Sequence, residues 1–376
     1  MGIFANPLTD LLEYEDFSRD FLKGTDPVGM TGCIDSEKVH FMSTFLGEKK
    51  VQLVVTYNEQ RAREIEEDYK LFCSQVYVIP PRDLIFFSAD LQGNAIIAER
   101  MKAFAALYQN EAKVSITTMD ALMSAAVPFE QLMSHVIKLK EGDELDLEKL
   151  KHDLTVMGYE RVGRVEEPGQ FTVHGGIADV YPLTMEVPVR IELWGDEIDT
   201  IRCFEPQSQR SMDQIECVSV FPAAEVIADD TARRRAVGMI QNELESQLAV
   251  FKKVKEPDKA KRLREETNRI LEALGEDVVL EAPDSYISYF YPRTVQLSEY
   301  FDEKNTLVFL DEPMRLKERG DGVQAEFEES MKNRLEQGFL LPGQTALLTP
   351  AKHVLAAFER GQVAALSSLD SRLADF

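Results

Sequence analysis

The first 128 residues alternate between short apolar runs and longer amphipathic stretches. Apolar runs at residues 51–55, 76–79 and 114–118 have the length and the β-branched composition of buried strands. Residues 59–71 and 95–108 have the length and spacing of helices, and Pro80-Pro81 ends the second strand. Strands separated by segments of helical length predict a parallel sheet with helices on its faces.

Beyond about residue 129 the pattern changes to short alternating segments separated by glycine and proline. Residues 147–157 suit a short helix. Two rows of side chains then alternate along one strand, apolar Val189, Ile191 and Leu193 against Arg190, Glu192 and Trp194. Gly195-Asp196 is a two-residue hairpin signal, and residues 198–204 suit the returning strand. We therefore expect a small antiparallel α+β domain that ends near residues 221–222.

The last third of the chain returns to the pattern of the first. Residues 225–275 are charged and helical in spacing, and residues 278–280 and 306–310 are strand-like again. Basic runs at residues 233–235 and 252–253 are interpreted as solvated helix faces. We expect residues 1–128 and 225–376 to build one α/β body, into which residues 129–224 are inserted as the small domain.

Net charge limits the kinds of partner that the chain can bind. Acidic residues outnumber basic ones by 66 to 42, which gives a formal net charge of -24. A nucleic-acid groove needs clustered lysine and arginine to replace the counterions of the phosphates. We therefore expect any role connected with DNA to act through a protein partner. The start of the chain lacks the pattern of a signal peptide, and no apolar run approaches the roughly 20 residues of a membrane span, so a cytoplasmic protein is expected.

The spacing of cysteine and histidine residues predicts neither a metal site nor a disulfide. The four cysteines, at positions 33, 73, 203 and 217, lack CxxC spacing, and the five histidines are equally scattered. We predict no metal site, no cofactor and no catalytic residue.

The stretch from Gly169 to Phe221 carries a recognisable series of motifs. A strand ending in Val-His-Gly leads to Asp179-Val180-Tyr181-Pro182 and then to the run Arg-Ile-Glu-Leu-Trp-Gly-Asp-Glu-Ile that begins at Arg190. This order resembles the pattern shared by UvrB and the transcription-repair coupling factors. Residues 209–211 and 83–94 favour the coupling factors over UvrB.

The resemblance implies a face that binds the repair protein UvrA. In the family, an arginine at the start of this strand and an aromatic residue four positions later contact UvrA, and these correspond to Arg190 and Trp194, with Glu192 between them. A third family arginine corresponds to His174, so that contact has either been lost or replaced by an imidazole meeting an acid. A purely structural alternative is that Trp194 caps the hairpin core while Arg190 pairs with Glu192 or Asp199.

The resemblance also raises the question of a nucleotide site. UvrB has a phosphate-binding loop of the form GxxxxGK[ST], and the equivalent segment here begins at Gly32 and ends at Val39. Lys38 is retained, but Glu37 replaces a glycine beside the phosphate path and Val39 replaces the hydroxyl that would hold magnesium. An acidic pair at residues 311–312 resembles a Walker B strand end, and we expect it to be an ordinary acidic strand end with no phosphate loop to face. The region of the DNA-clamping hairpin of UvrB, residues 80–93, is short and offers only Phe86 and Phe87.

Together these features predict a degenerate P-loop, helicase-like parallel-sheet body with an inserted antiparallel α+β domain. The expected function is a UvrA-recruiting docking module in transcription-coupled nucleotide excision repair, without enzymatic activity of its own. In the family, RNA polymerase binding and ATP-driven translocation on double-stranded DNA belong to further regions. The alternatives are a UvrB-type nucleotide hydrolase and a domain that binds damaged DNA directly. The sequence leaves open the oligomeric state and whether the UvrA face is masked in a longer protein.

Overall fold

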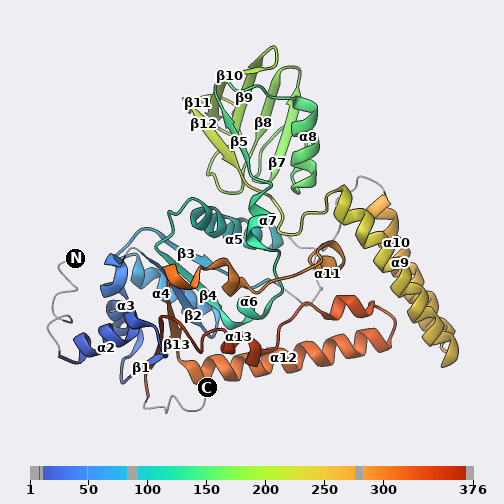
Figure 1. Cartoon of the computed structure of the whole chain (residues 1–376). Helices are drawn as coiled ribbons and strands as arrows, with labels where there is room; N and C mark the ends of the chain where they lie inside the picture. Colours follow the sequence, from blue (N-terminus) through green and yellow to red (C-terminus); the bar gives the residue numbers. More distant parts are fainter. Residues whose placement is uncertain (1–7, 9–11, 49, 83–91, 276–282, 370–376) are drawn as a thin grey trace.

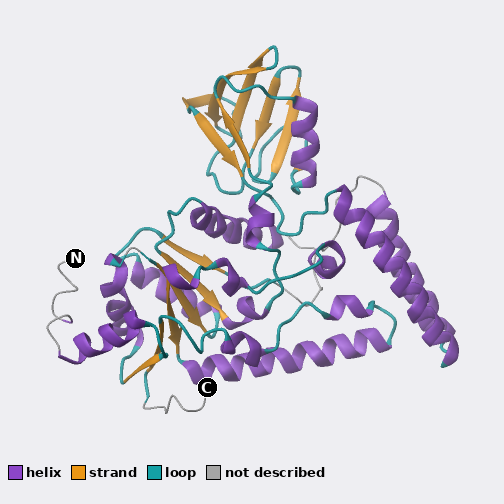
Figure 2. Ribbon diagram, viewed as in Figure 1, coloured by secondary structure: helices purple, strands orange, loops and turns teal. Residues whose placement is uncertain are grey.

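A computed structural model describes residues 8, 12–48, 50–82, 92–275 and 283–369 of the chain. An α/β body carries a small β-rich lobe on one side, and a long helical hairpin projects from one end of the body (Figure 1). Figure 2 shows that strands form the centre of both the body and the lobe, whereas the hairpin is entirely helical. In the described residues, no helix is long and apolar enough to cross a membrane.

The body is built on one six-stranded parallel sheet with strand order β1-β14-β13-β2-β4-β3. Strands at residues 51–55, 76–79, 114–118 and 306–310 were predicted and are confirmed, and β1 and β14 are additional. Because β13 lies between β14 and β2, the two ends of the chain share the sheet. The strands are β1 (Val28–Thr31), β2 (Val51–Thr56), β3 (Val76–Ile79), β4 (Val114–Thr118), β13 (Thr306–Asp311) and β14 (Val363–Ser367).

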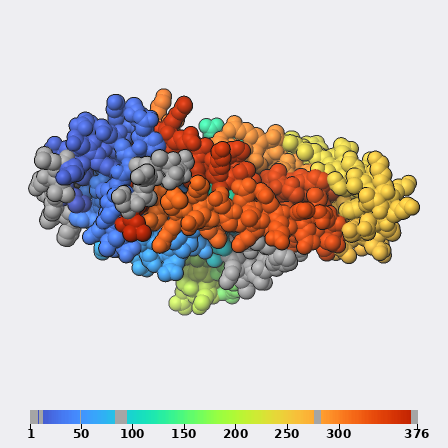
Figure 3. All heavy atoms as spheres, turned by 90° about the horizontal axis from the view of Figure 1, so that it is seen from below, coloured from blue at the N-terminus to red at the C-terminus, as the bar shows by residue number. Residues whose placement is uncertain are grey.

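Helices cover both faces of this sheet, and each face has its own apolar core. Along β2, Leu53 and Val55 belong to one core and Val54 to the other, as expected of a strand that is buried on both sides. Figure 3 shows α12 running from the N-terminal part toward the helical hairpin. The helices of the body are α2 (Leu12–Lys23), α3 (Asp35–Ser43), α4 (Glu59–Tyr69), α5 (Gln92–Tyr108), α6 (Met119–Met123), α7 (Phe129–Met133), α11 (Ile287–Phe290), α12 (Pro313–Glu336) and α13 (Ala351–Ala356). Short 3-10 turns lie at Thr44–Gly47, Pro283–Tyr286, Leu297–Tyr300, Glu303–Asn305 and Pro342–Thr345.

The lobe consists of a six-stranded sheet, a two-stranded sheet and one helix around a separate core. The large sheet has the order β11-β10-β9-β8-β7-β6, and every pairing in it is antiparallel except that of β6 with β7. The fold class expected from the sequence is therefore confirmed. The elements are β5 (Ile137–Lys140), α8 (Leu147–Val156), β6 (Glu160–Arg161), β7 (Gln170–His174), β8 (Ile177–Val180), β9 (Val189–Trp194), β10 (Glu197–Phe204), β11 (Ser211–Gln214) and β12 (Cys217–Val220).

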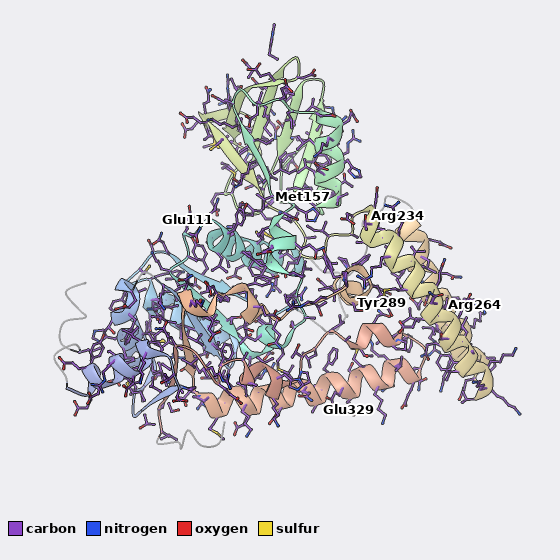
Figure 4. The ribbon with its side chains drawn as sticks, viewed as in Figure 1. Glu111, Met157, Arg234, Arg264, Tyr289 and Glu329 are labelled. Atoms are coloured by element: carbon purple, nitrogen blue, oxygen red, sulfur yellow. The ribbon has the colours of Figure 1, made fainter. Side chains whose placement is uncertain are left out.

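The projecting hairpin is formed by α9 (Asp230–Lys253) and α10 (Pro257–Gly275). Tyr289 of α11 lies between this hairpin and the body (Figure 4), and its hydroxyl donates to the carboxylate of Glu243 on α9. The strand predicted at residues 278–280 lies outside the described residues. So do Phe86, Phe87 and most of the motif at residues 83–94.

A buried ion network fastens the lobe to the body where the chain leaves the lobe. Glu225 follows β12 and receives hydrogen bonds from Arg100 of α5, including one of 3.0 Å between Nη2 and Oε2. Arg82 lies 3.8 Å from the same carboxylate and bonds Asp284 at 2.8 Å. Burial raises the pKa of Glu225, but the two arginines outweigh burial, so the net effect is a lowered pKa. Nearby, the carbonyl of Met157 accepts from Ala223 at the base of the lobe (Figure 4).

Candidate functional site

The residues that the resemblance points to lie on the outer face of the lobe's large sheet. Val189 and Ile191 are fully buried, whereas Arg190 and Glu192 are half-buried and Trp194 is exposed. The alternation predicted for this strand is thus confirmed. Trp194 pairs with Glu197 across the turn formed by Gly195 and Asp196, and the φ of +66° at Gly195 favours glycine there.

Arg190 is held by Asp179, which stands directly opposite it on β8. Its Nε and Nη2 donate to the two carboxylate oxygens of Asp179 at 2.8 and 2.7 Å. These hydrogen bonds raise the pKa of Arg190. The sequence-based alternative named Glu192 or Asp199 as the partner of Arg190, and that was wrong. The reason is the register, since residues directly opposite in neighbouring strands have side chains closer together than residues two apart in one strand.

Two further residues hold the guanidinium of Arg190 in place. Its carbon lies 4.8 Å from the ring centre of Phe204, a cation–π distance. Its Nη2 also donates to Oε1 of Gln209 at 3.3 Å, and the amide of Gln209 is tied to the carbonyls of Val165 and Pro206 at 3.1 and 2.7 Å. The roles of Asp179 and Gln209 were not predicted, although both residues fall within the motifs that identified the stretch.

Trp194 is the most exposed large apolar side chain among those described, with 84% of its surface accessible. It therefore does not cap the hairpin core, and the structural alternative is wrong on this point as well. Glu192 accepts a hydrogen bond of 3.1 Å from the hydroxyl of Thr200. Single large apolar residues on a surface are common, but an exposed tryptophan on the same face as an ordered arginine combines two residue types that dominate protein interfaces.

His174 joins the same face at the end of β7. It is exposed and pairs with Ile177, which in turn pairs with Glu192 on β9. Its Nε2 lies 2.9 Å from the hydroxyl of Thr172. The structure thus brings His174, Arg190, Glu192 and Trp194 together on one face.

The degenerate phosphate loop lies at the carboxyl end of β1 and leads into α3. Gly32 keeps the left-handed conformation, with φ of +81°. Glu37 is exposed, and its Oε2 accepts a 3.3 Å hydrogen bond from the backbone of Ile34 at the start of the helix. Val39 is fully buried in one of the two cores of the body. The two changed positions thus serve helix capping and packing.

Lys38 does not point toward open space. Its buried Nζ donates to Asp311 at 2.7 Å and to Glu312 at 2.6 Å. We expected this acidic pair to have no loop partner, and that was wrong, because the retained lysine of the loop is its partner. Burial raises the pKa of Glu312, but hydrogen bonds from Lys38 and Ser368 outweigh burial and leave the pKa lowered.

Further groups complete the charge balance around Asp311. The hydroxyl of Thr56 donates to its Oδ2 at 2.8 Å, and Nε of the buried Arg61 lies 3.4 Å from the same oxygen. Arg61 also bonds the backbone carbonyl of Asp35 at 3.2 Å, which connects α4 to the loop. The two cations and two carboxylates of this cluster compensate one another's charge.

Within the described part of the chain, no group of three or more His, Cys, Asp or Glu side chains is placed to hold a metal ion. The four cysteines are free thiols, and only Cys217 among them is exposed.

Comparison with known proteins finds similarities for the lobe and for most of the chain. Residues 137–225 match the UvrB interaction domain family. The transcription-repair-coupling factor of Bacillus subtilis (strain 168) is 30% identical over 342 residues, which cover 89% of this chain and 29% of that protein. The factor of Staphylococcus epidermidis (strain ATCC 12228) is 30% identical over 91% of this chain, and that of Staphylococcus aureus (strain USA300) is 28% identical over 92%.

This chain spans less than a third of the length of these relatives. The similarity extends well beyond the lobe into the α/β body, because about nine tenths of the chain is aligned. Residues 137–225 are thus similar to the UvrB interaction domain family, and most of the chain is similar to a part of the transcription-repair-coupling factors.

Proposed function

We propose that this chain is a docking module that recruits UvrA in transcription-coupled nucleotide excision repair. The observation that carries the proposal is Trp194, which stands 84% exposed at the tip of a matched UvrB interaction domain. Aromatic side chains that are buried on binding supply a large share of interface free energy. The lobe at residues 129–224 is the proposed docking domain, and residues 1–128 and 225–376 are the scaffold that carries it.

The ordering of Arg190 supports recognition by a preorganised face. Asp179, Phe204 and Gln209 hold its guanidinium before any partner arrives. A side chain that is already ordered loses little conformational entropy on binding. The Arg100–Glu225 contact at the base of the lobe extends this order to the connection with the body.

The scaffold itself is proposed to lack nucleotide chemistry. Lys38 would have to leave Asp311 and Glu312 before it could bind a phosphate, and two buried carboxylates would then stand unpaired. This argument weighs against the alternative of a UvrB-type hydrolase. Contact with RNA polymerase, ATP and double-stranded DNA is assigned to the portion of the relatives that this chain does not cover.

The test is the affinity of purified UvrA for the chain, measured by biolayer interferometry. Trp194→Ala should weaken binding by about 2–4 kcal/mol, the range of an interface hot spot. Leu71→Ala is the matched control, because Leu71 is a similarly exposed apolar residue, at 78%, in the segment after α4. UvrA binding that is equal in wild type and Trp194→Ala would refute the proposed face.

The two alternative functions have their own tests. Calorimetric titration with ATP and magnesium tests nucleotide binding, and a gel shift with lesion-bearing duplex tests direct DNA binding. We expect neither to show saturable binding, because Lys38 is already paired and the chain carries a net charge of -24.

A further inference from the structure

The tip of the lobe gathers carboxylates around Trp194. The segment that precedes α8 runs beside the start of β10, with hydrogen bonds of 2.8 Å from Leu145 to Asp196 and 2.9 Å from Ile198 to Asp143. Glu144 pairs with Glu197 across this contact, and Glu197 pairs with Trp194 across the hairpin. Side chains at paired positions share a face, so Glu144, Glu197 and Trp194 form a row across three adjacent segments.

The negative charge of this tip is not compensated within the described residues. The tip has four exposed carboxylates, and none of them forms an ion pair within the described residues. They belong to Asp143, Glu144, Asp196 and Glu197. Two basic side chains of the lobe are engaged elsewhere, since Lys149 pairs with Asp153 at 2.6 Å and Arg190 with Asp179 at 2.7 Å. The part of the proposed face that is free to meet a partner is therefore acidic.

This arrangement is unfavourable for the isolated lobe. Like charges directly opposite each other in neighbouring strands destabilise a sheet, and Glu144 faces Glu197. An exposed tryptophan adds apolar surface at the same place. A cationic partner would remove both unfavourable features, because it would compensate the charges of Glu144 and Glu197 and cover the indole ring of Trp194.

A groove of about 670 Å³ lies at the same tip but on the Leu193 side of the sheet, between the hairpin turn and the start of α8. Leu145, Leu147 and Leu193 line it together with the carboxylate-bearing Glu144 and Asp196, and Lys149, which pairs with Asp153, also lies in its wall. Apolar walls with acidic ends suit the side chain of arginine or lysine, whose aliphatic stem packs on apolar surface while its charge meets a carboxylate. A guanidinium can in addition lie over an indole ring.

We propose that the surface of UvrA that meets this tip is a basic segment, whose arginine or lysine side chains contact Trp194, Glu197 and Glu144 and enter the groove at the same tip. The inference rests on the proposed docking function and specifies the chemistry of the partner. In this proposal the acidic tip supplies the charges that attract UvrA. Arg190, whose charge is compensated by Asp179, is a positioning residue on the same face.

The experiment measures the affinity of UvrA for four variants of the chain at one salt concentration. Glu144→Gln/Glu197→Gln should weaken binding about threefold to tenfold, and Glu144→Lys/Glu197→Lys by tenfold or more, because reversal replaces attraction with repulsion. Glu167→Lys is the control, since Glu167 precedes β7 at the opposite end of the lobe from the hairpin turn. Trp194→Ala reports whether the face is used at all.

The outcomes separate this inference from the proposed function. If Trp194→Ala weakens binding while the two double variants bind as well as wild type or more tightly, the basic segment is refuted and the docking function stands. If Trp194→Ala has no effect, the docking face itself is wrong. An equal loss in Glu167→Lys would show a general charge effect and would also overturn the inference. The Gln double variant should melt no lower than wild type, since it removes a repulsive pair.

Discussion

The carboxylate of Asp179 receives two hydrogen bonds from the guanidinium of Arg190, its direct cross-strand neighbour. Asp179 is buried, so this pairing compensates a charge that is largely removed from water. The arginine that the family resemblance assigns to partner binding is thus also part of the lobe's own structure. Its loss has consequences for both stability and binding.

Arg190→Ala is expected to destabilise the fold by about 2–4 kcal/mol, because it leaves the carboxylate of Asp179 buried without a partner. Trp194→Ala should change the stability much less, because the side chain of Trp194 is 84% exposed. Urea unfolding of the two alanine variants measures the difference directly.

Asp179→Asn/Arg190→Ala is the control, because it removes the buried charge together with its partner. It should recover part of the stability lost in Arg190→Ala. Equal unfolding midpoints for wild type and Arg190→Ala would show that the pairing contributes nothing to the fold.

Lys38→Met is expected to cost about 3–5 kcal/mol of stability, since it leaves Asp311 and Glu312 facing each other without their shared cation. Asp311→Asn/Glu312→Gln in the same background removes the uncompensated charge and should recover part of the loss. The measurement is again urea unfolding. A Lys38→Met protein as stable as wild type would contradict the assignment of Lys38 to a structural role.

ATP with magnesium is expected to leave the melting temperature of the chain unchanged. A ligand that binds only the folded state at 100 times its dissociation constant would stabilise it by about 2.7 kcal/mol, which is readily detected. The compensated cluster of Lys38, Arg61, Asp311 and Glu312 leaves no cation for the added phosphate charge. A saturable increase in melting temperature at micromolar ATP would refute this expectation.

Acid should weaken the attachment of the lobe through Glu225. Its pKa in the folded protein lies below the ordinary value of about 4.3 for an unfolded glutamate. A lowered folded pKa gives stability that is present above about pH 4.3 and is lost as pH falls toward the folded pKa. Glu225→Gln should therefore be less stable than wild type at pH 7, and the difference should shrink by pH 3.

The matched control for this pH experiment is Glu130→Gln, since Glu130 is an exposed glutamate on α7. Its unfolding free energy should follow that of wild type at every pH. If the gap between wild type and Glu225→Gln stays constant from pH 7 to pH 3, the Arg100–Glu225 pairing does not contribute in the way described.

Local patterns in the sequence were sufficient for most of the elements and for the family. The alternation at residues 189–194 and the hairpin signal at Gly195-Asp196 are properties of neighbouring residues, and both were predicted correctly. Strand β14 was not predicted. Its sequence, Val-Ala-Ala-Leu-Ser, is short and rich in alanine, and only its place between β1 and β13 makes it a central strand.

The sites depended on contacts that local patterns do not contain. Lys38 and Asp311 are separated by 273 residues, and their pairing follows from the order of strands in the sheet. The partner of Arg190 depends on the register of β8 against β9, which motif order alone does not specify. The exposure of Trp194 likewise depends on its position in the folded sheet, at the end of β9 beside the hairpin turn.

His174→Arg tests whether the third family contact persists in this chain. His174 lies in a row with Ile177 and Glu192, one position from the acidic tip, and an arginine there would be charged at every pH. If the contact has been lost, wild-type affinity for UvrA should be the same at pH 6 and pH 8, and His174→Arg should change it by less than about twofold. If the imidazole meets an acid on UvrA, binding should strengthen toward pH 6, where histidine gains a proton, and the arginine variant should bind more tightly at pH 8. We expect affinity that does not depend on pH and does not change in His174→Arg. The proposed UvrA segment at the neighbouring Trp194 is basic, so a positive charge at position 174 would not attract it.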